Sequence, residues 1–398
     1  FHADPPHGTA GWPIAFADLE PYYREAEALL GVGTFACEAD LERIHSRAAP
    51  AGGDWQAMPM PMGLAANIAM HRDEAAHFDG FASAQGLKGE AELSFLSRLA
   101  DRPNFMLLPH AEVRSLLGVD SSPATIVGVR LTDNRELRAP RVLLAAGALH
   151  SPRLLARHVA AAGLERELLA ARNVGRYLKL HLLTAMVSIG PRRMTDLIRK
   201  TTVLINERFP HSSVQPLGFD GELIGTLMPK ALPRFARRAL GERAYGFFLQ
   251  TEDGSDARNR VTERSLSTTS PPVLDYDETR LPAATREHAA FTRALRVALL
   301  RAGLVSFTQR IGLNGTAHAC GTLICGTDPA TSVVDARGAV HGMRGLYVVD
   351  GSVLPRSSRV NPSLSIYAWG LRTADLLARE FVRETAETRE QPEAAHAG

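Results

Sequence analysis

The spacing of apolar residues changes along the chain and divides it into segments with different predicted structures. Residues 18–33 and 285–303 have apolar positions at helical intervals, and Gly31 is placed to end the first helix. Residues 105–147 contain short apolar runs broken by turn residues, which is typical of β-strands. Residues 181–309 combine further strand-like runs with basic and proline-rich loops, which predicts a second domain built on an antiparallel sheet.

Two short apolar runs are predicted to be buried strands. The run 142–145 reaches Gly147, and Ser151 with Pro152 predicts the cap and first position of a helix. A second run of the same kind covers residues 346–349. A buried strand that enters a helix through a glycine turn is typical of α/β folds, which bind ligands at strand ends. We therefore predict an α/β fold, α+β when the antiparallel domain is included.

Small and polar residues gather between positions 311 and 371. Asp350 and Gly351 directly follow the second strand, where an acidic residue and a glycine allow a polar ligand to approach closely. Asn361 and Pro362 predict a helix start whose exposed amides can bind an anion or a carbonyl oxygen. The ordinary alternatives are a turn residue for Asp350 and a simple helix cap for Asn361.

His318 is the candidate general base of this region. It lies in the segment His-Ala-Cys-Gly-Thr, and a histidine beside small residues can be accessible and titrate near neutral pH. A plain loop histidine is the alternative. Cys320 and Cys325 do not have the spacing of a zinc pair and no fourth ligand is evident, so no metal is expected. A nucleophilic Cys320 is disfavoured because its side chain would diverge from that of His318.

Composition and charge narrow the classes of function. The 398 residues suffice for two or three domains, and the net charge of +2 gives no reason to expect a nucleic-acid partner. No apolar run reaches the ~18 residues of a membrane span. The 3 cysteines are too few for a disulfide scaffold and fit a reducing compartment, and no secretory signal opens the chain. We therefore expect a cytoplasmic protein without a membrane span.

Three blocks of the C-terminal region, in the right order, resemble the glucose–methanol–choline (GMC) oxidoreductases, which are flavin enzymes that oxidise alcohols. The blocks are residues 318–335, 345–352 and 360–375. Residues 145–155 are similar to an upstream signature of the family, and the segments around 12–23 and 79–88 also resemble it. Ordered blocks along most of the chain are more specific than any single motif.

The resemblance implies a division of the chain into domains. Residues 1–180 and 310–380 would form the FAD-binding domain, and residues 181–309 would be an inserted substrate-binding domain with an antiparallel sheet. The tail 381–398 is polar and rich in alanine and glutamate, and it is predicted to be disordered.

The resemblance also implies a reaction and a set of site residues. A hydride would pass from an alcohol carbon to N5 of FAD, His318 would take the hydroxyl proton, and Asn361 would orient the alcohol oxygen. The substrate would be a small-molecule alcohol, with oxygen or another molecule as the electron acceptor. The implied FAD contacts are Val113 and Ala146 on the adenine side, Asp350 and Gly351 by the pyrophosphate and ribityl chain, and Asn361, Pro362 and Ser363 at the flavin.

The chain departs from the family pattern near its first residues. The FAD fingerprint G-x-G-x-x-G is absent, because the pair Gly31 and Gly33 follows a helix and lacks a third glycine. We therefore expect the parent gene to encode an FAD-binding βαβ unit before Phe1. One alternative is a non-catalytic remnant that cannot hold FAD. Another is an unrelated hydrolase, which is disfavoured because the chain contains no G-x-S-x-G elbow.

Overall fold

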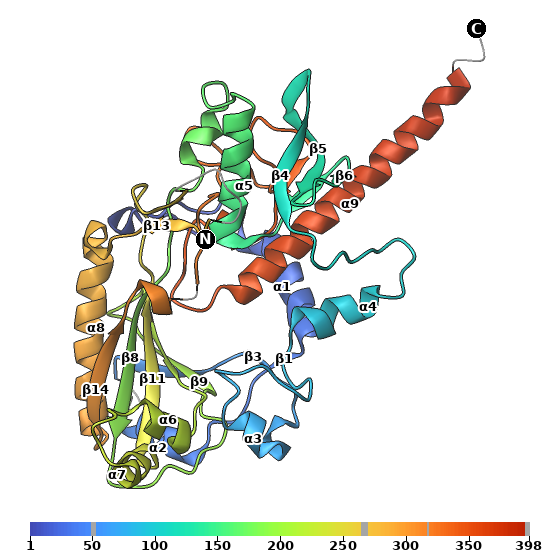
Figure 1. Ribbon diagram of the computed structural model, residues 1–398. Helices are drawn as coiled ribbons and strands as arrows, with labels where there is room; N and C mark the ends of the chain where they lie inside the picture. Colours follow the sequence, from blue (N-terminus) through green and yellow to red (C-terminus); the bar gives the residue numbers. More distant parts are fainter. Residues whose placement is uncertain (49–52, 264–269, 317, 395–398) are drawn as a thin grey trace.

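The computed structural model describes residues 1–48, 53–263, 270–316 and 318–394. Two lobes make up the chain, and the long helix α9 runs from between them past the upper one (Figure 1). We call them the sheet lobe, after its large sheet, and the parallel-pair lobe, after two short parallel strands.

Six antiparallel strands form the sheet of the sheet lobe, as predicted for this part of the chain. From one edge to the other, the strands are β14 (Val305–Ile311), β8 (Leu182–Ile189), β11 (Ala244–Thr251), β10 (Ser212–Pro216), β9 (Thr202–Asn206) and β2 (Trp55–Pro59). The sheet differs from the expected segment 181–309 at both edges. β2 comes from the N-terminal part of the chain, and β14 continues to Ile311.

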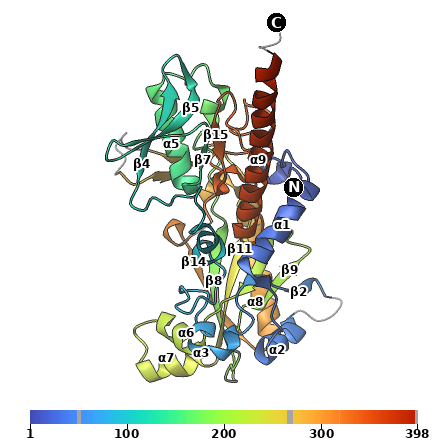
Figure 2. The ribbon, with the colours of Figure 1, turned by 90° about the vertical axis from the view of Figure 1, so that its right-hand side faces the viewer.

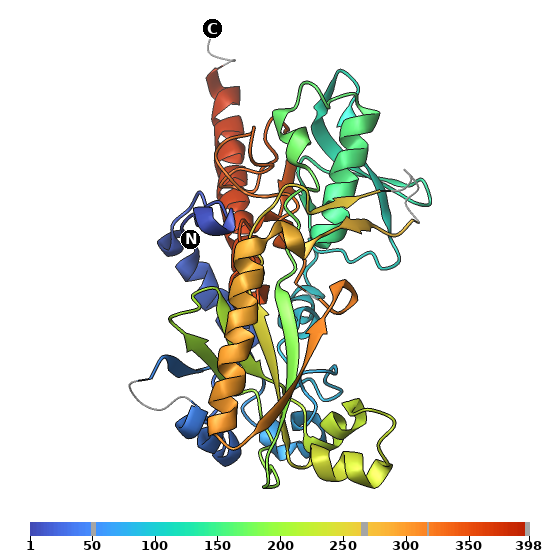
Figure 3. The same cartoon turned by 90° about the vertical axis from the view of Figure 1, so that its left-hand side faces the viewer.

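The two faces of this sheet have different characters because successive side chains of a strand alternate between faces. One face packs against α8 (Pro282–Arg301) and α2 (Ala39–Ala48), and Figure 3 shows α8 lying along the sheet. On β11, Tyr245, Phe247 and Leu249 are fully buried in this core. The intervening residues of β11 point to the opposite face, which belongs to the candidate site described below.

The parallel-pair lobe is built around β7 (Val142–Leu144) and β15 (Leu346–Val348). These strands pair in parallel, with Leu346 opposite Val142, so the two apolar runs predicted to be buried strands are direct neighbours. The helix α5 (Gly147–Ala161) follows β7. Its predicted start at Ser151 is wrong, because Ala146 is the cap. The Ser151 hydroxyl lies inside the helix, 3.1 Å from the Ala146 amide.

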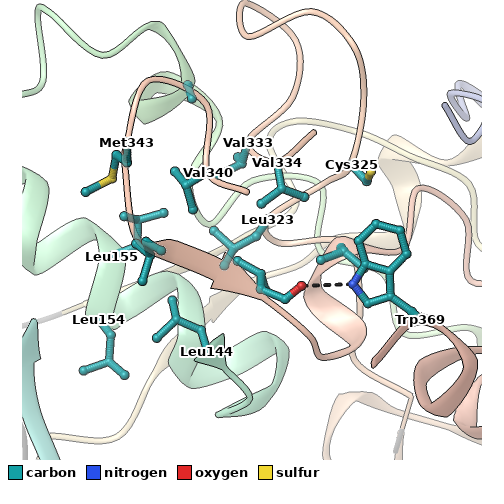
Figure 4. Packing of buried hydrophobic residues seen from close by; sticks show 14 of the residues in the cluster. Leu144, Leu154, Leu155, Leu323, Cys325, Val333, Val334, Val340, Met343 and Trp369 are labelled. Carbon is teal, nitrogen blue, oxygen red and sulfur yellow. Dashed lines mark hydrogen bonds between the residues drawn. The ribbon is translucent and has the colours of Figure 1, made fainter. Parts of the chain in front are cut away.

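The core of this lobe lies between the strand pair and two helices (Figure 4). Leu144 of β7, Leu155 of α5 and Leu323 are buried there with Trp369 of α9. The Trp369 indole donates a hydrogen bond to the Val348 carbonyl oxygen at 2.9 Å, which satisfies its polar atom within an apolar environment. The core therefore fixes the start of α9 relative to the end of β15.

Helix α1 (Phe16–Leu30) packs along α9 (Ser363–Ala394), and Figure 2 shows them side by side. The disordered tail predicted from residue 381 is contradicted as far as Ala394, since α9 continues through it. Ion pairs of Glu380 with Arg337 and of Glu384 with Arg141 tie this extension to the lobe. Alanine and glutamate also have high helix propensity, so a composition rich in both favours a helix here.

Shorter elements complete the chain. The remaining strands are β1 (Val32–Gly33), β3 (Met62–Gly63), β4 (Val113–Val119), β5 (Ser122–Leu131), β6 (Glu136–Arg138), β12 (Arg260–Thr262) and β13 (Val273–Asp275). The remaining helices are α3 (Arg72–Ala75), α4 (Ser97–Leu99), α6 (Gly221–Leu227) and α7 (Arg234–Gly241). Single turns are η1 (Pro5–His7), η2 (Ile68–Met70), η3 (Glu92–Leu96), η4 (Leu169–Asn173), η5 (Glu278–Arg280), η6 (Leu313–Gly315) and η7 (Gly351–Val353). Among the described residues, no helix combines the length and apolar composition that a membrane crossing requires.

Candidate active site

Asp350 joins the carboxyl ends of the two parallel strands. Its Oδ2 accepts hydrogen bonds from the Gly147 amide at 2.8 Å and from the Ser151 hydroxyl at 2.5 Å. Its Oδ1 accepts from the Ser352 amide at 2.9 Å. The carboxylate is buried, so it is held by the protein on both oxygens. Asp350 thus fixes the start of α5 against the end of β15, at the edge where α/β folds bind ligands.

The space beside Gly147, at the end of β7, is open, whereas the space beside Gly351, at the end of β15, is filled. Gly147 has a φ of +76°, and no described atom lies within 4 Å of the position that a Cβ would occupy there. A Cβ on Gly351, by contrast, would lie 3.0 Å from Cδ1 of Ile366 and 3.6 Å from the Ala319 carbonyl oxygen. Gly351 therefore lets the first turn of α9 and the residue next to His318 approach each other.

The other predicted cofactor contacts lie at the starts of β4, α5 and α9. Val113 is the first residue of β4 and is half-buried, and Ala146 is the exposed cap of α5. Pro362 accepts the first backbone hydrogen bond of α9, from Ile366 at 3.0 Å, and Ser363 is its first helical residue. The helix thus starts one position later than the sequence suggested. The unpaired amides of its first turn carry the positive end of a long helix dipole.

His318 is held by a second histidine that the sequence analysis did not identify. The Nδ1 atoms of His318 and His181 lie 3.2 Å apart, and the two rings meet edge to face. His181 is fully buried, and its Nε2 lies 2.8 Å from the Ser358 carbonyl oxygen and 3.0 Å from that of Ser357. His181 and Ser358 both adopt a left-handed backbone, with φ values of +66° and +64°. Such strained residues concentrate at functional sites.

These contacts determine which nitrogen of His318 is free. Because carbonyl oxygens only accept, the Nε2 of His181 must carry a hydrogen. Burial lowers the pKa of His181, so the ring is neutral and its Nδ1 accepts. The Nδ1 of His318 must then be the donor in the bond between the two rings. The remaining nitrogen of a neutral His318, Nε2, has a lone pair that can accept a proton.

His318 is neutral over most of the physiological pH range. Burial lowers its pKa to about 4, and the neighbouring His181 and Lys200 act in the same direction. Lys200 itself pairs with Asp79 at 2.6 Å and lies on the connection between β8 and β9. The site therefore keeps His318 in its basic, uncharged form and surrounds it with groups that disfavour its protonation.

Asn361 is anchored to the sheet by a glutamine. Its Oδ1 lies 3.3 Å from Nε2 of Gln215, and its Nδ2 lies 3.4 Å from the Gln215 Oε1, so the two amides face each other in a weak pair. The preceding residues are anchored too, because the Ser213 hydroxyl donates to the Arg359 carbonyl oxygen at 2.5 Å. Ser213 and Gln215 alternate with residues that face α8, so they belong to the opposite face of the sheet.

Both candidate catalytic residues are thus attached to one polar region of the sheet. His181 directly precedes β8, Gln215 lies on β10, and Gln250 lies on the intervening strand β11. Gln250 is opposite both Ser213 and Leu183 in the strand pairing, and its amide lies 3.4 Å from the His181 Nε2. The loop 357–361 lies over these side chains and receives their hydrogen bonds.

Solved structures show which fold this arrangement belongs to. An FAD-dependent oxidoreductase from Chaetomium thermophilum superposes with a TM-score of 0.59 at 15% identity, covering 94% of this chain and 82% of that chain. Pyridoxine 4-oxidase from Mesorbium loti superposes with a TM-score of 0.56 at 19% identity, covering 92% and 71%. The fold is therefore that of FAD-dependent oxidoreductases.

The sequence comparisons identify the family. GMC oxidoreductase family models match residues 7–183 and 255–370. The 6'''-hydroxyparomomycin C oxidase of Streptomyces lividus is 30% identical over 418 residues, covering 94% of this chain and 73% of that protein. Paromamine 6'-oxidase of Streptomyces fradiae is 28% identical over 403 residues, with the same coverage. The chain belongs to the GMC oxidoreductases, as the resemblance predicted, and is an enzyme of this FAD-dependent family.

Proposed function

We propose that the protein oxidises a hydroxyl group of a small, sugar-like alcohol, with His318 as the general base and Asn361 as its hydrogen-bonding partner. The observation that carries this proposal is the contact of the His318 Nδ1 with His181, whose own Nε2 faces two carbonyl oxygens, and from it we assign Nε2 of His318 as the free acceptor. A neutral histidine with one free nitrogen can remove the hydroxyl proton. Asn361 cannot titrate, and its amide can donate to the alcohol oxygen while negative charge develops there.

FAD, when bound, supplies the acceptor for the hydride that leaves the alcohol carbon. The residues proposed to hold it come from the ends of the two parallel strands and from the starts of β4 and α9. They are Val113, Ala146, Asp350, Gly351, Asn361, Pro362 and Ser363. The open space at Gly147 and the free amides of the first turn of α9 both suit an extended ligand with polar, anionic groups. Asp350 contributes by holding α5 and β15 together.

A cavity beside Asn361 supports a sugar-like substrate. It has a volume of about 290 Å³ and is lined by aromatic and charged side chains, including Trp12, Tyr23, Glu252, Arg356 and Asn361, whereas His318 is not among its lining residues. Aromatic surface combined with a few convergent polar groups is typical of small-molecule sites. The names of the two Streptomyces relatives indicate oxidation of aminoglycosides. A polyol with one reactive hydroxyl is therefore the substrate class that we propose.

A panel of aminosugars tests this substrate class. The FAD-loaded protein is mixed anaerobically with paromamine-like compounds, with the same compounds lacking one hydroxyl, and with simple aliphatic alcohols. We expect flavin reduction with a hydroxylated aminosugar and none with the matching deoxy compound. Reduction by aliphatic alcohols alone would contradict the sugar-like substrate but not the oxidation chemistry. Repeating the mixture with and without oxygen then decides whether oxygen or another acceptor reoxidises the flavin.

The alternative of a non-catalytic remnant makes a different prediction about FAD. If the 398 residues form such a remnant, they should not retain FAD through gel filtration after incubation with an excess. A yellow protein that keeps a stoichiometric amount of FAD through gel filtration would contradict this alternative.

The cytoplasm is the proposed location of the protein, supported by the free state of Cys37, Cys320 and Cys325.

The lowered pKa of His318 predicts an unusual pH profile. A histidine with an ordinary pKa near 6.5 would lose its base form as the pH falls through that value. Because the pKa of His318 is about 4, its base form should persist to lower pH and be lost only as the pH falls through that value. We therefore expect the rate of flavin reduction to be level from pH 8 down to about 5. Anaerobic reduction rates measured across this range check the profile.

His181 should act as a positioning residue for His318. The variant His181→Asn keeps a side chain that tolerates the left-handed backbone but no longer offers a ring nitrogen to His318. We expect flavin reduction to slow by about tenfold or more, because His318 can then place its proton on either nitrogen. We expect the unfolding temperature to fall as well, because His181 is buried and donates to the carbonyl oxygens of Ser357 and Ser358, so rates are compared at equal FAD occupancy. Unchanged reduction at full FAD occupancy would show that the tautomer is fixed by something else.

A further inference from the structure

A cluster of metal-binding side chains lies where the N-terminal segment meets the sheet lobe. It consists of Asp4, His7 and His211, whose ligand atoms all lie within 4.8 Å of one another. Asp4 caps the single turn η1, His7 ends it, and His211 directly precedes β10. The proposed oxidation uses none of these residues. We propose that they bind a divalent transition-metal ion, for which Zn²⁺ is the best match.

His7 is the observation that points to a ligand. Its side chain is only 6% exposed, and neither of its ring nitrogens has a hydrogen-bond partner among the described residues. A buried polar group without a partner is costly, and a metal ion would satisfy it. The ring stacks on His211 with centroids 3.6 Å apart and planes 29° apart. Because His7 makes no side-chain hydrogen bond, its ring can turn a nitrogen toward an ion without breaking one.

His211 is already oriented as a metal ligand. Its Nδ1 lies 2.9 Å from Oε2 of Glu287 on α8, and its Nε2 lies 2.5 Å from Oδ2 of Asp4. Glu287 is itself fixed, because its Oε1 accepts from the Ser212 hydroxyl at 2.8 Å and from the His211 amide at 3.0 Å. A carboxylate that holds the far nitrogen of an imidazole is the usual outer partner of a histidine ligand.

The spacing of the ligand atoms requires a small adjustment. Tetrahedral zinc with bonds of ~2.0–2.1 Å places its ligand atoms ~3.4 Å apart. Nδ1 of His7 lies 3.8 Å from Oδ2 of Asp4, which is close to this value. Asp4 and His211 must separate by roughly 1 Å, and the proton that Nε2 of His211 shares with Asp4 is released to solvent as both groups bind the metal.

The donor atoms and charges favour a transition-metal dication. Two imidazoles and one carboxylate suit zinc and similar ions, whereas magnesium and calcium prefer oxygen ligands alone. Asp4, Glu252 and Glu287 place three carboxylates around the cluster. Arg356 pairs with Glu252 at 2.5 Å and lies 3.9 Å from Asp4, so it offsets part of this charge. An ion here would also link the N-terminal segment to α8 through His211 and Glu287.

Zinc titration of the chelator-treated protein tests the site. We expect isothermal titration calorimetry to show one equivalent of Zn²⁺ bound by the parent protein, and thermal unfolding to shift upward with zinc. The variant His7→Ala should bind at least tenfold more weakly, and its unfolding temperature without zinc is measured as well because the packing of the buried ring on His211 is also lost. His2→Ala is the matched control, since His2 is exposed on the same segment and should bind zinc normally.

A second variant keeps the proposal testable if His7→Ala perturbs the fold. Glu287→Gln retains an oxygen that can accept from Ser212 but weakens the support of His211. We expect it to lower zinc affinity by about 10–100-fold. Absence of stoichiometric zinc binding by the parent protein would overturn the proposal. Binding by His7→Ala as tight as that of His2→Ala would overturn it as well.

Discussion

Replacing His318 with alanine should slow alcohol-driven flavin reduction by about 10²–10⁴-fold, the usual contribution of a positioned general base. The variant removes the free Nε2 acceptor but none of the groups proposed to hold FAD. Rapid mixing of the FAD-loaded variant with substrate, without oxygen, measures this step independently of the electron acceptor. FAD content measured before mixing separates a loss of chemistry from a loss of cofactor.

A matched control exists for this experiment. His45 on α2 is also buried, and burial lowers its pKa to about 4, as it does for His318. Its Nε2 lies 3.4 Å from the Thr202 hydroxyl, so it sits on the sheet without belonging to the histidine pair. In the variant His45→Gln, the alcohol should reduce the flavin at nearly the rate measured for the parent protein. Near-parent reduction by His318→Ala, with FAD bound, would remove His318 from the mechanism.

The variant Asn361→Ala should slow flavin reduction by about 10²–10³-fold, the scale for losing one donor to a developing oxyanion. The effect should be smaller than that of His318→Ala if Asn361 only orients and stabilises the alcohol oxygen. Among the described residues, the amide of Asn361 pairs weakly with Gln215 and with no other side chain, so its loss should leave the loop in place.

Two comparisons sharpen the Asn361 experiment. The exposed Asn67, at the start of η2, provides a surface Asn→Ala control that should not alter the rate. Gln215→Met removes the partner of Asn361 but keeps a side chain of similar length. We expect it to slow reduction less than Asn361→Ala does. A larger loss in Gln215→Met would instead assign the contact with the alcohol to the glutamine.

The sequence predicted those features of the fold that depend on local pattern and residue type alone. The apolar runs 142–145 and 346–349 predicted two buried strands, and their parallel pairing places Asp350 at a shared edge. Exact helix starts were less predictable. Ser151 resembles a cap, but its hydroxyl binds the Asp350 carboxylate, so α5 starts one turn earlier. The competing partner lies 199 positions away, beyond the reach of local pattern.

His181 could not be predicted from the sequence for the same reason. It is one of 14 histidines and stands before a strand without a distinguishing motif. Its role depends on the carbonyl oxygens of Ser357 and Ser358 and on His318, all more than 130 positions away in the chain. The left-handed backbone that aims its ring is likewise a property of the folded chain.

A single anaerobic turnover with isotopically labelled substrate tests the central claim most directly. The FAD-loaded protein is mixed with an aminosugar that carries deuterium on the carbon bearing the reactive hydroxyl. We expect one carbonyl product per reduced flavin and slower reduction than with the unlabelled compound, because the bond to that hydrogen breaks. Full FAD occupancy and bound substrate without carbonyl product or flavin reduction would contradict it.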